Sequence, residues 1–398
     1  MNFIVIFLVS LTCIMSVIWA KKIDGNWLSP TSCFVLGNTF TYLLYLLNTD
    51  LFVKVNYSTF IILITSFILF FFGSISAELS RMYKISILKD KSMNINGIQM
   101  MIYLSFFVGI FSTLYLWKGN LSTYGLTYIL SDFDEVMRRG FDNAQFIGNF
   151  ALWLVFVLPL CLEKYYVENK INKQNLVLCI IAIIGLIFLR KKTYIFLSLV
   201  MVIWIAIKHS KNLIKTLKIL ILLLCSSILV FFISFKLILS DNSSEIIYKN
   251  IIMYFSGSWA ALGELIIHQP FNPTHFGQHV FYPIYKVLSL FYNVDPGKIE
   301  MEGMYIPDWF NVYTMHGEAF VDFGYIGIIL QTFILGFVSQ IFYRKSILKN
   351  SVRADLIYGI FFFCIIMSFF VSEITHFITW FLLISIYVLA YFSSKISR

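Results

Sequence analysis

Three ionisable residues in the C-terminal third of the chain have the types that acid–base chemistry needs. His316, Glu318 and Asp322 lie where a long stretch rich in aromatics, prolines and glycines, 240–318, meets an apolar run, 319–342. Ionisable side chains are costly to bury in a membrane, so their presence there predicts a functional site. A carboxylate or histidine beside a substrate hydroxyl can act as a general base. The alternative is that the acids only meet the dipole at a helix N-terminus.

Glu318 and Asp322 are four residues apart, so they share one face of a helix if that helix begins before Glu318. Gly324 and Gly327 follow, and they would allow a neighbouring helix to pack closely. Glu373 and His376, in the last outer turn, could face the same region, although an ordinary polar turn is the favoured interpretation.

A basic turn is the second place where chemistry is expected. Arg190, Lys191 and Lys192 join two short apolar runs, 174–189 and 193–207. Helices of this length are only about 24 and 22 Å long, which would hold the turn below the outer membrane surface. Arginine and lysine there predict a site for a phosphate or pyrophosphate. The alternatives are basic side chains that extend to lipid headgroups, or a re-entrant pair of helices.

The stretch 118–143 is predicted to be an outer loop with an amphipathic, interfacial helix. Asp134 and Arg138, like Glu135 and Arg139, are four residues apart with the acid first, which favours helical ion pairs. Self-neutralising surface pairs are therefore the favoured interpretation. Contact of the arginines with a second phosphate or a sugar is the alternative.

The stretch 240–318 is predicted to be one long outer loop. Within it, 254–264 resembles a short interfacial helix, with Trp259 suited either to the headgroup level or to a sugar face. His275 and His279 are spaced to present two metal ligands. No third ligand is evident, so packing within the loop is favoured and no metal is expected.

The amino-acid composition shows that the chain is built for a membrane rather than for water. Of 398 residues, 59% are hydrophobic and 13% charged, and the mean hydropathy is +0.81. Soluble domains carry about 25% charged residues, so an ordinary soluble enzyme, a disordered chain and a nucleic-acid-binding domain are excluded. All six cysteines lie in apolar runs, which argues against a disulfide framework or a zinc site. The chain is predicted to be an all-α polytopic membrane protein.

A single membrane domain over 1–398 is expected to contain about eleven transmembrane helices. A span needs roughly 20 mostly apolar residues. The candidate runs are 2–20, 32–50, 58–77, 98–117, 144–162, 174–189, 193–207, 219–239, 319–342, 355–372 and 377–392.

The orientation follows from the basic residues. With the N-terminus outside, short inward segments hold 19 of the 30 lysines and arginines, as the positive-inside rule requires. This predicts an N-out, C-in protein. The first run lacks a basic segment before it and is interpreted as a retained helix rather than a signal peptide.

These features together resemble the Wzy-type O-antigen and capsule repeat-unit polymerases. The resemblance rests on the number of spans with one long outer loop, on the turn Arg190-Lys-Lys-Thr193, and on one motif-like run. That run contains Asn311, Tyr313, Thr314, Gly317, Glu318, Asp322, Phe323, Gly324 and Gly327. The two lysines after Arg190 depart from the pattern of the family.

The resemblance implies a fold like that of C-type glycosyltransferases in the bacterial inner membrane. It implies transfer between two undecaprenyl-pyrophosphate-linked glycans at the periplasmic face, with Arg190 stabilising the departing pyrophosphate and His316 or Glu318 as base. No metal or other cofactor and no nucleic acid is expected. Membrane lipids, a flippase and a chain-length regulator would be its partners. Residues expected to bind substrate are Lys191, Lys192, Arg138, Arg139, Tyr313, Asp322 and Trp259.

Two other functions remain open at this point. An O-antigen ligase shares the architecture and the donor but transfers the glycan to a sugar of the lipid A core. A lipid-linked glycan flippase or other transporter should carry charged residues deep in several helices. The helices here are nearly free of charge in their middles, which favours an enzyme facing outward.

Overall fold

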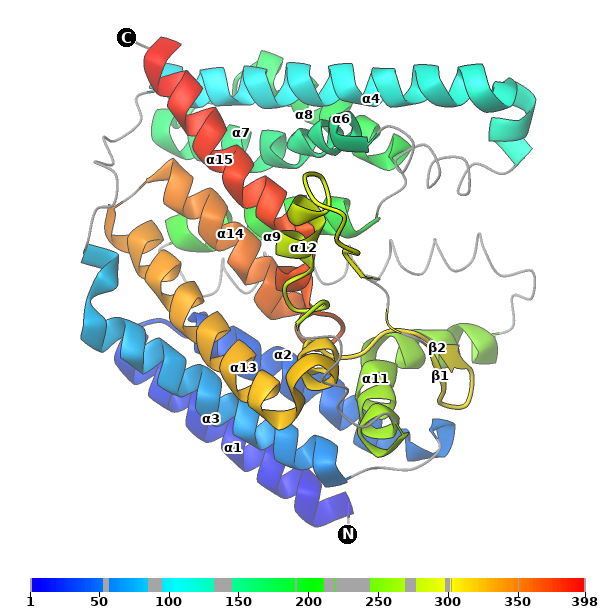
Figure 1. Cartoon of the computed structure of the whole chain (residues 1–398). Coiled ribbons are helices and arrows are strands. Elements are labelled where there is room, and N and C mark those ends of the chain that lie inside the picture. The colour runs from blue at the N-terminus through cyan, green and yellow to red at the C-terminus, as the bar shows by residue number, and fades with distance from the viewer. Residues whose placement is uncertain are drawn as a thin grey trace. The chain divides into compact units, whose positions relative to one another are not determined.

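The protein is almost entirely helical (Figure 1). The structure, a computed structural model, describes residues 2–52, 57–84, 95–131, 145–189, 192–210, 218, 244–268, 277–297, 301, 303–349 and 351–396. Within these ranges, seven helices are long and apolar enough to cross a membrane. This confirms an all-α polytopic membrane protein, whereas the count of eleven spans and the N-out, C-in orientation stay predictions.

The chain divides into two compact units, each built from separate parts of the sequence. Unit 1 comprises 1–86, 229–345 and 361–380, and unit 2 comprises 87–228, 346–360 and 381–398. Helices α13 (His316–Lys349), α14 (Val352–Met367) and α15 (Phe377–Ile396) each contribute residues to both units.

Among the described residues, unit 1 contains five further α-helices, three 3₁₀ turns and a small hairpin. The helices are α1 (Asn2–Asp24), α2 (Pro30–Leu47), α3 (Tyr57–Ser80), α11 (Ser244–His268) and the short α12 (Tyr282–Leu288). The 3₁₀ turns are η1 (Thr49–Leu51), η2 (Met82–Lys84) and η5 (Glu373–Thr375). Strands β1 (Met304–Tyr305) and β2 (Trp309–Phe310) pair antiparallel.

Glycines bring α3 and α13 into backbone contact in unit 1. A Cβ added at Gly73 would collide with the carbonyl oxygen of Phe333, and one at Gly336 would collide with that of Phe70. Small residues permit such close approach of membrane helices. Phe34 of α2 stacks on Phe70 with ring centroids 4.3 Å apart, so α2 packs against the same region.

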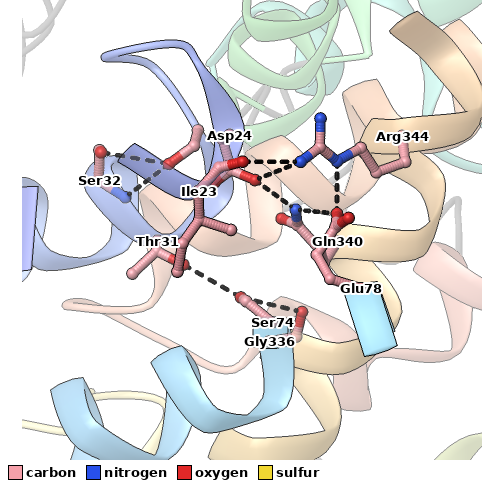
Figure 2. A network of polar contacts seen from close by, with 10 residues as sticks. Ile23, Asp24, Thr31, Ser32, Ser74, Glu78, Gly336, Gln340 and Arg344 are labelled. Carbon is pink, nitrogen blue, oxygen red and sulfur yellow. Dashed lines mark hydrogen bonds and ion pairs between the residues drawn. The ribbon is translucent and has the colours of Figure 1, made fainter. Parts of the chain in front are cut away.

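A polar network ties together one end of unit 1 (Figure 2). Arg344 near the end of α13 bonds the carboxylates of Asp24 and Glu78 and the carbonyl oxygen of Ile23. Gln340 donates to Asp24 at 2.6 Å and to Glu78 at 2.8 Å. The C-terminal ends of α1, α3 and α13 therefore lie at the same end of unit 1, as the predicted threading requires.

Unit 2 is built from helices around a fully buried segment. Its elements are α4 (Ile95–Ser131), α6 (Gln145–Asn149), the 3₁₀ helix η3 (Phe150–Phe156), α7 (Val157–Glu168), α8 (Lys173–Phe188) and α9 (Lys192–His209). Six consecutive residues of η3, 151–156, are buried. The indole of Trp153 donates to Ser385 of α15 at 2.8 Å, which anchors η3 against that helix.

Ion pairs also gather at one end of unit 2. Lys208 contacts Asp355 at 2.6 Å, and His209 contacts Glu163 at 3.3 Å. The C-terminal ends of α7 and α9 and the N-terminal end of α14 therefore meet. The charge distribution predicts that all three face inward.

Helices lie over ten of the eleven predicted runs, and 219–239 lies outside the described residues. Two helices differ from the prediction in extent. α4 continues beyond residue 117 to Ser131, with a break at Gly125 (φ 72°), so the predicted outer loop 118–143 begins as helix. α11 occupies 25 residues of the predicted long loop, where only a short helix over 254–264 is expected. Its serines, glycines and acids weaken the apolar signal, and packing within unit 1 supplies the burial.

Candidate functional site

The chain enters the core of unit 1 just before α13. Tyr313, Thr314, Met315 and His316 are all buried, and the backbone N–H of Met315 donates to the carbonyl oxygen of Ser368 at 2.9 Å. Non-helical backbone at membrane depth is tolerated only where protein or a water-filled cavity satisfies it. The residues before α13 therefore form a buried, non-helical entry rather than part of an exposed loop.

Helix α13 is broken at Gly324, where φ is +61° and ψ is −148°. Only glycine adopts this conformation readily. The break separates a first segment, 316–323, from a second, 325–349. A Cβ at Gly327 would collide with the carbonyl oxygen of Ala319, so the two segments pack on each other. This corrects one expectation, because Gly327 serves a fold of α13 on itself rather than the packing of a neighbouring helix.

Asp322 organises one side of the site. Its carboxylate lies 2.8 Å from Nδ1 of His279 and accepts the backbone N–H groups of His279 (2.9 Å) and Val280 (2.8 Å). The Asp322 side chain is fully buried. The hydrogen bond to Asp322 is the main cause that raises the pKa of His279. His279 is therefore tied to a carboxylate through Nδ1.

Glu318 lies one turn before Asp322 and has a different environment. Its side chain is buried, and its Oε2 has no hydrogen-bond partner among the described residues. The charges of His376 and His279 act on its carboxylate, and the side chain of Thr375 lies within hydrogen-bonding reach of it. A buried polar atom without a partner needs an explanation, such as a catalytic role. Glu318 thus has a free oxygen beside two histidines.

Glu373 and His376 form the other side of the site. Nδ1 of His376 lies 3.1 Å from the carboxylate of Glu373, which is only 7% exposed, whereas His376 is 28% exposed. Burial lowers the pKa of His376, but the hydrogen bond and charge of Glu373 and the charge of Glu318 outweigh it and raise the pKa to about 9. This corrects the favoured interpretation, because an ordinary polar turn would not bury an acid beside Glu318.

His316 is packed more deeply than Glu318. Its side chain has no exposed surface, and Nε2 lies 3.1 Å from Oγ of Ser66 near the middle of α3. Nδ1 has no hydrogen-bond partner within the part of the chain that the structure describes. The ring therefore lies inside the helix packing, whereas Glu318 as a whole residue keeps 7% of its surface exposed.

Two predicted substrate-binding aromatics are also packing residues in this structure. Trp259 is fully buried, its indole donates to Thr41 at 3.1 Å, and its ring meets Tyr42 edge to face at 5.2 Å. Zero exposure does not agree with an accessible sugar face, whereas the placement of Trp259 at the headgroup level stays a prediction. Tyr313 is 4% exposed and packs closely against Gly317.

Several predicted site residues lie outside the described residues. These are Arg190, Lys191, Arg138, Arg139 and His275. Lys192 begins α9, but its side chain is not among those described. The anion site at the basic turn and the role of the arginine pair therefore stay predictions.

The described ranges contain no group of three or more histidines, cysteines, aspartates or glutamates that could hold a metal ion. The site is instead two histidine–carboxylate pairs, His279–Asp322 and His376–Glu373, with Glu318 electrostatically coupled to both histidines. Such an arrangement can accept, hold and pass on a proton. Sequence reasoning missed the pairing of His279 with Asp322, because no local pattern links residues 43 positions apart.

Comparison with known proteins does not identify a family for this chain. The chain matches no family model, no curated protein and no solved structure. The resemblance to the Wzy-type polymerases stays a prediction from the motif and the arrangement of spans.

Proposed function

We propose that the protein is a membrane glycosyltransferase that polymerises undecaprenyl-pyrophosphate-linked repeat units at the periplasmic face of a bacterial inner membrane. The observation that carries the proposal is the buried Glu318 carboxylate, whose Oε2 has no hydrogen-bond partner in the described ranges and which has two histidine–carboxylate pairs beside it. A base of this kind suits a reaction that removes a proton from a sugar hydroxyl.

The reaction needs one proton acceptor and one stabilised leaving group. Glu318 would take the proton of the acceptor hydroxyl while its oxygen attacks the anomeric carbon of the donor glycan. The bond from that carbon to the lipid pyrophosphate breaks, and the pyrophosphate leaves with the bonding electrons. The basic turn at Arg190, Lys191 and Lys192 would stabilise the charge that develops on it.

Glu318 is a better candidate for the base than His316. A general base must come within about 3 Å of the proton that it removes. The His316 ring has no exposed surface and contacts Ser66. Its role in the proposal is to fix the start of α13, which positions Glu318 two residues later.

A transporter is the second candidate, because α13 is broken beside a buried acid. Broken helices with charged residues near the break line the substrate sites of many transporters. A flippase would move the lipid-linked repeat unit without changing its covalent structure, so product analysis separates the two functions. An O-antigen ligase would need a lipid A core acceptor, whereas the proposed polymerase would use a second lipid-linked unit.

The test is polymer formation by the purified full-length protein in liposomes that contain lipid-linked repeat units. Glu318→Gln keeps the shape of the side chain and removes the base, so the rate should fall by roughly 10²–10⁴. His316→Gln should lower the rate of polymer formation less than Glu318→Gln does. Glu264→Gln is a matched control, because Glu264 is an acid of α11 that pairs with the exposed His268.

Polymer formation at the wild-type rate by Glu318→Gln would reject Glu318 as the base. If the wild-type protein only moved repeat units across the bilayer, the transporter would replace the enzyme. If polymer formed only when a lipid A core acceptor was supplied, the ligase would replace the polymerase.

A further inference from the structure

Unit 2 contains an open cavity of about 370 Å³ between α7 and α8. Cys161, Leu162 and Tyr165 line it from α7, and Leu176 and Cys179 line it from α8. Most of its wall is apolar. The volume lies within the roughly 300–1,000 Å³ of small-molecule sites.

The two helices form an antiparallel hairpin that is tight at one end and open at the other. At the tight end, α8 packs against η3, which leads directly into α7: a Cβ added to Gly185 would come within 2.7 Å of the Leu154 side chain, and Ala182 is fully buried. Halfway along, Cys161 and Cys179 lie side by side in the cavity wall. The cavity extends from this pair to the turn between the helices, where Asn169 has φ +52°.

Lysines stand at the open end of the cavity. Lys164 and Lys170 both line it, together with a single acid, Glu168. The ammonium of Lys164 bonds Gln99 at 2.5 Å and pairs with Glu168 at 3.3 Å, so it is held in place and partly neutralised. Lys170 is exposed. The mouth thus carries an excess of positive charge over an apolar interior.

The outer face of α8 indicates that the helix beside the cavity is surrounded by lipid. Leu176, Ile180, Ile184 and Ile187 are each 45–55% exposed in a helix that has no acidic residue. Such a face needs hydrocarbon around it. The basic residues of the turn place the mouth on the inward side under the positive-inside rule, where basic sites between membrane helices bind anionic headgroups.

We propose that this cavity binds an anionic glycerophospholipid of the inner leaflet, with one acyl chain between α7 and α8 and the phosphate beside Lys164 and Lys170. The apolar wall matches the chain, and the excess positive charge at the mouth matches the phosphate. The site is distinct from the cluster around Glu318 in unit 1 and does not depend on the proposed function.

The test uses the purified full-length protein with an equimolar mixture of phosphatidylglycerol and phosphatidylcholine of identical acyl chains. Native mass spectrometry counts the lipids that remain bound. The wild-type protein should retain one phosphatidylglycerol in preference. Lys170→Glu should lower the ratio of bound phosphatidylglycerol to phosphatidylcholine at least three-fold. Lys173→Glu is the matched control, because it makes the same charge change in the same turn at a residue that does not line the cavity.

A second pair of variants tests the acyl-chain site. Cys161→Trp should fill the cavity and remove the retained lipid of either type, whereas Ile180→Trp on the exposed face of α8 should keep it. Equal retention of both lipids by the wild-type protein would overturn the proposal. So would equal effects of the two lysine variants, full retention by a folded Cys161→Trp, or displacement of phosphatidylglycerol by an equimolar polyprenyl phosphate. If Cys161→Trp does not fold, the lysine pair decides alone.

Discussion

Asp322 binds His279 twice, through the imidazole at 2.8 Å and through the backbone N–H at 2.9 Å. The N–H of Val280 adds a third bond at 2.8 Å. A buried carboxylate that accepts several donors is held in one orientation. Asp322 therefore fixes the 277–280 segment against α13, one turn from Glu318.

The first prediction concerns this pair. Asp322→Asn keeps the size of the side chain but removes its charge and turns one acceptor into a donor. We expect a loss of about 3–5 kcal/mol in the free energy of unfolding, as for other broken buried pairs. His279→Gln should cost less, because the two backbone bonds to Asp322 remain. Denaturant unfolding of both single variants and of the double variant would measure the coupling, and additive losses would contradict it.

The second prediction concerns the pH dependence of stability. The ordinary pKa of histidine is about 6.5, and Glu373 and Glu318 raise that of His376 to about 9 although burial opposes them. Because the folded state holds the proton more tightly, the stabilisation is fully present below about pH 6.5 and is lost as the pH rises to about 9.

The midpoint of thermal unfolding in detergent should therefore fall over this interval, and His376→Gln should flatten the fall. His268→Gln is the control, since His268 is 64% exposed and pairs with Glu264 on the same helix. An unchanged profile in the His376→Gln variant would contradict the assignment.

The sequence predicts the helices better than it predicts the site. Apolar runs of 15–24 residues locate most helices, because a membrane span must be long and apolar. The break at Gly324 is not predictable from glycine alone, since glycines also occur in unbroken membrane helices. It depends on the contact between Gly327 and Ala319. The burial of Trp259 and the pairing of His279 with Asp322 likewise depend on segments that lie far apart in the chain.

The third prediction concerns the network in Figure 2. Arg344 is 17% exposed and bonds two acids, of which Asp24 is 2% exposed. Arg344→Gln would leave these acids without their cation, at a cost of about 3 kcal/mol in unfolding free energy, the low end for buried pairs. Arg344→Lys should recover only part of this unfolding free energy, because an ammonium group lacks the planar set of donors that a guanidinium offers to two acids.

Lys345→Gln removes an equal charge at the next residue and serves as the control. The measurement is the midpoint of thermal unfolding of the three variants at one pH. Equal midpoints for Arg344→Gln and Lys345→Gln would show that the network contributes nothing beyond net charge.

The last prediction concerns orientation. The bonds of Arg344 to Asp24 and Glu78 require α1, α3 and α13 to end on the same side. Lys84 lies four residues after the end of α3, and Asp295 follows the segment that Asp322 holds at the other end of unit 1. In a cysteine-free background, an impermeant thiol reagent outside the cell should label Asp295→Cys but not Lys84→Cys. Both should react after permeabilisation. Because the ends of three helices are linked, the reverse pattern would invert the whole of unit 1 and move Glu318 away from the periplasm.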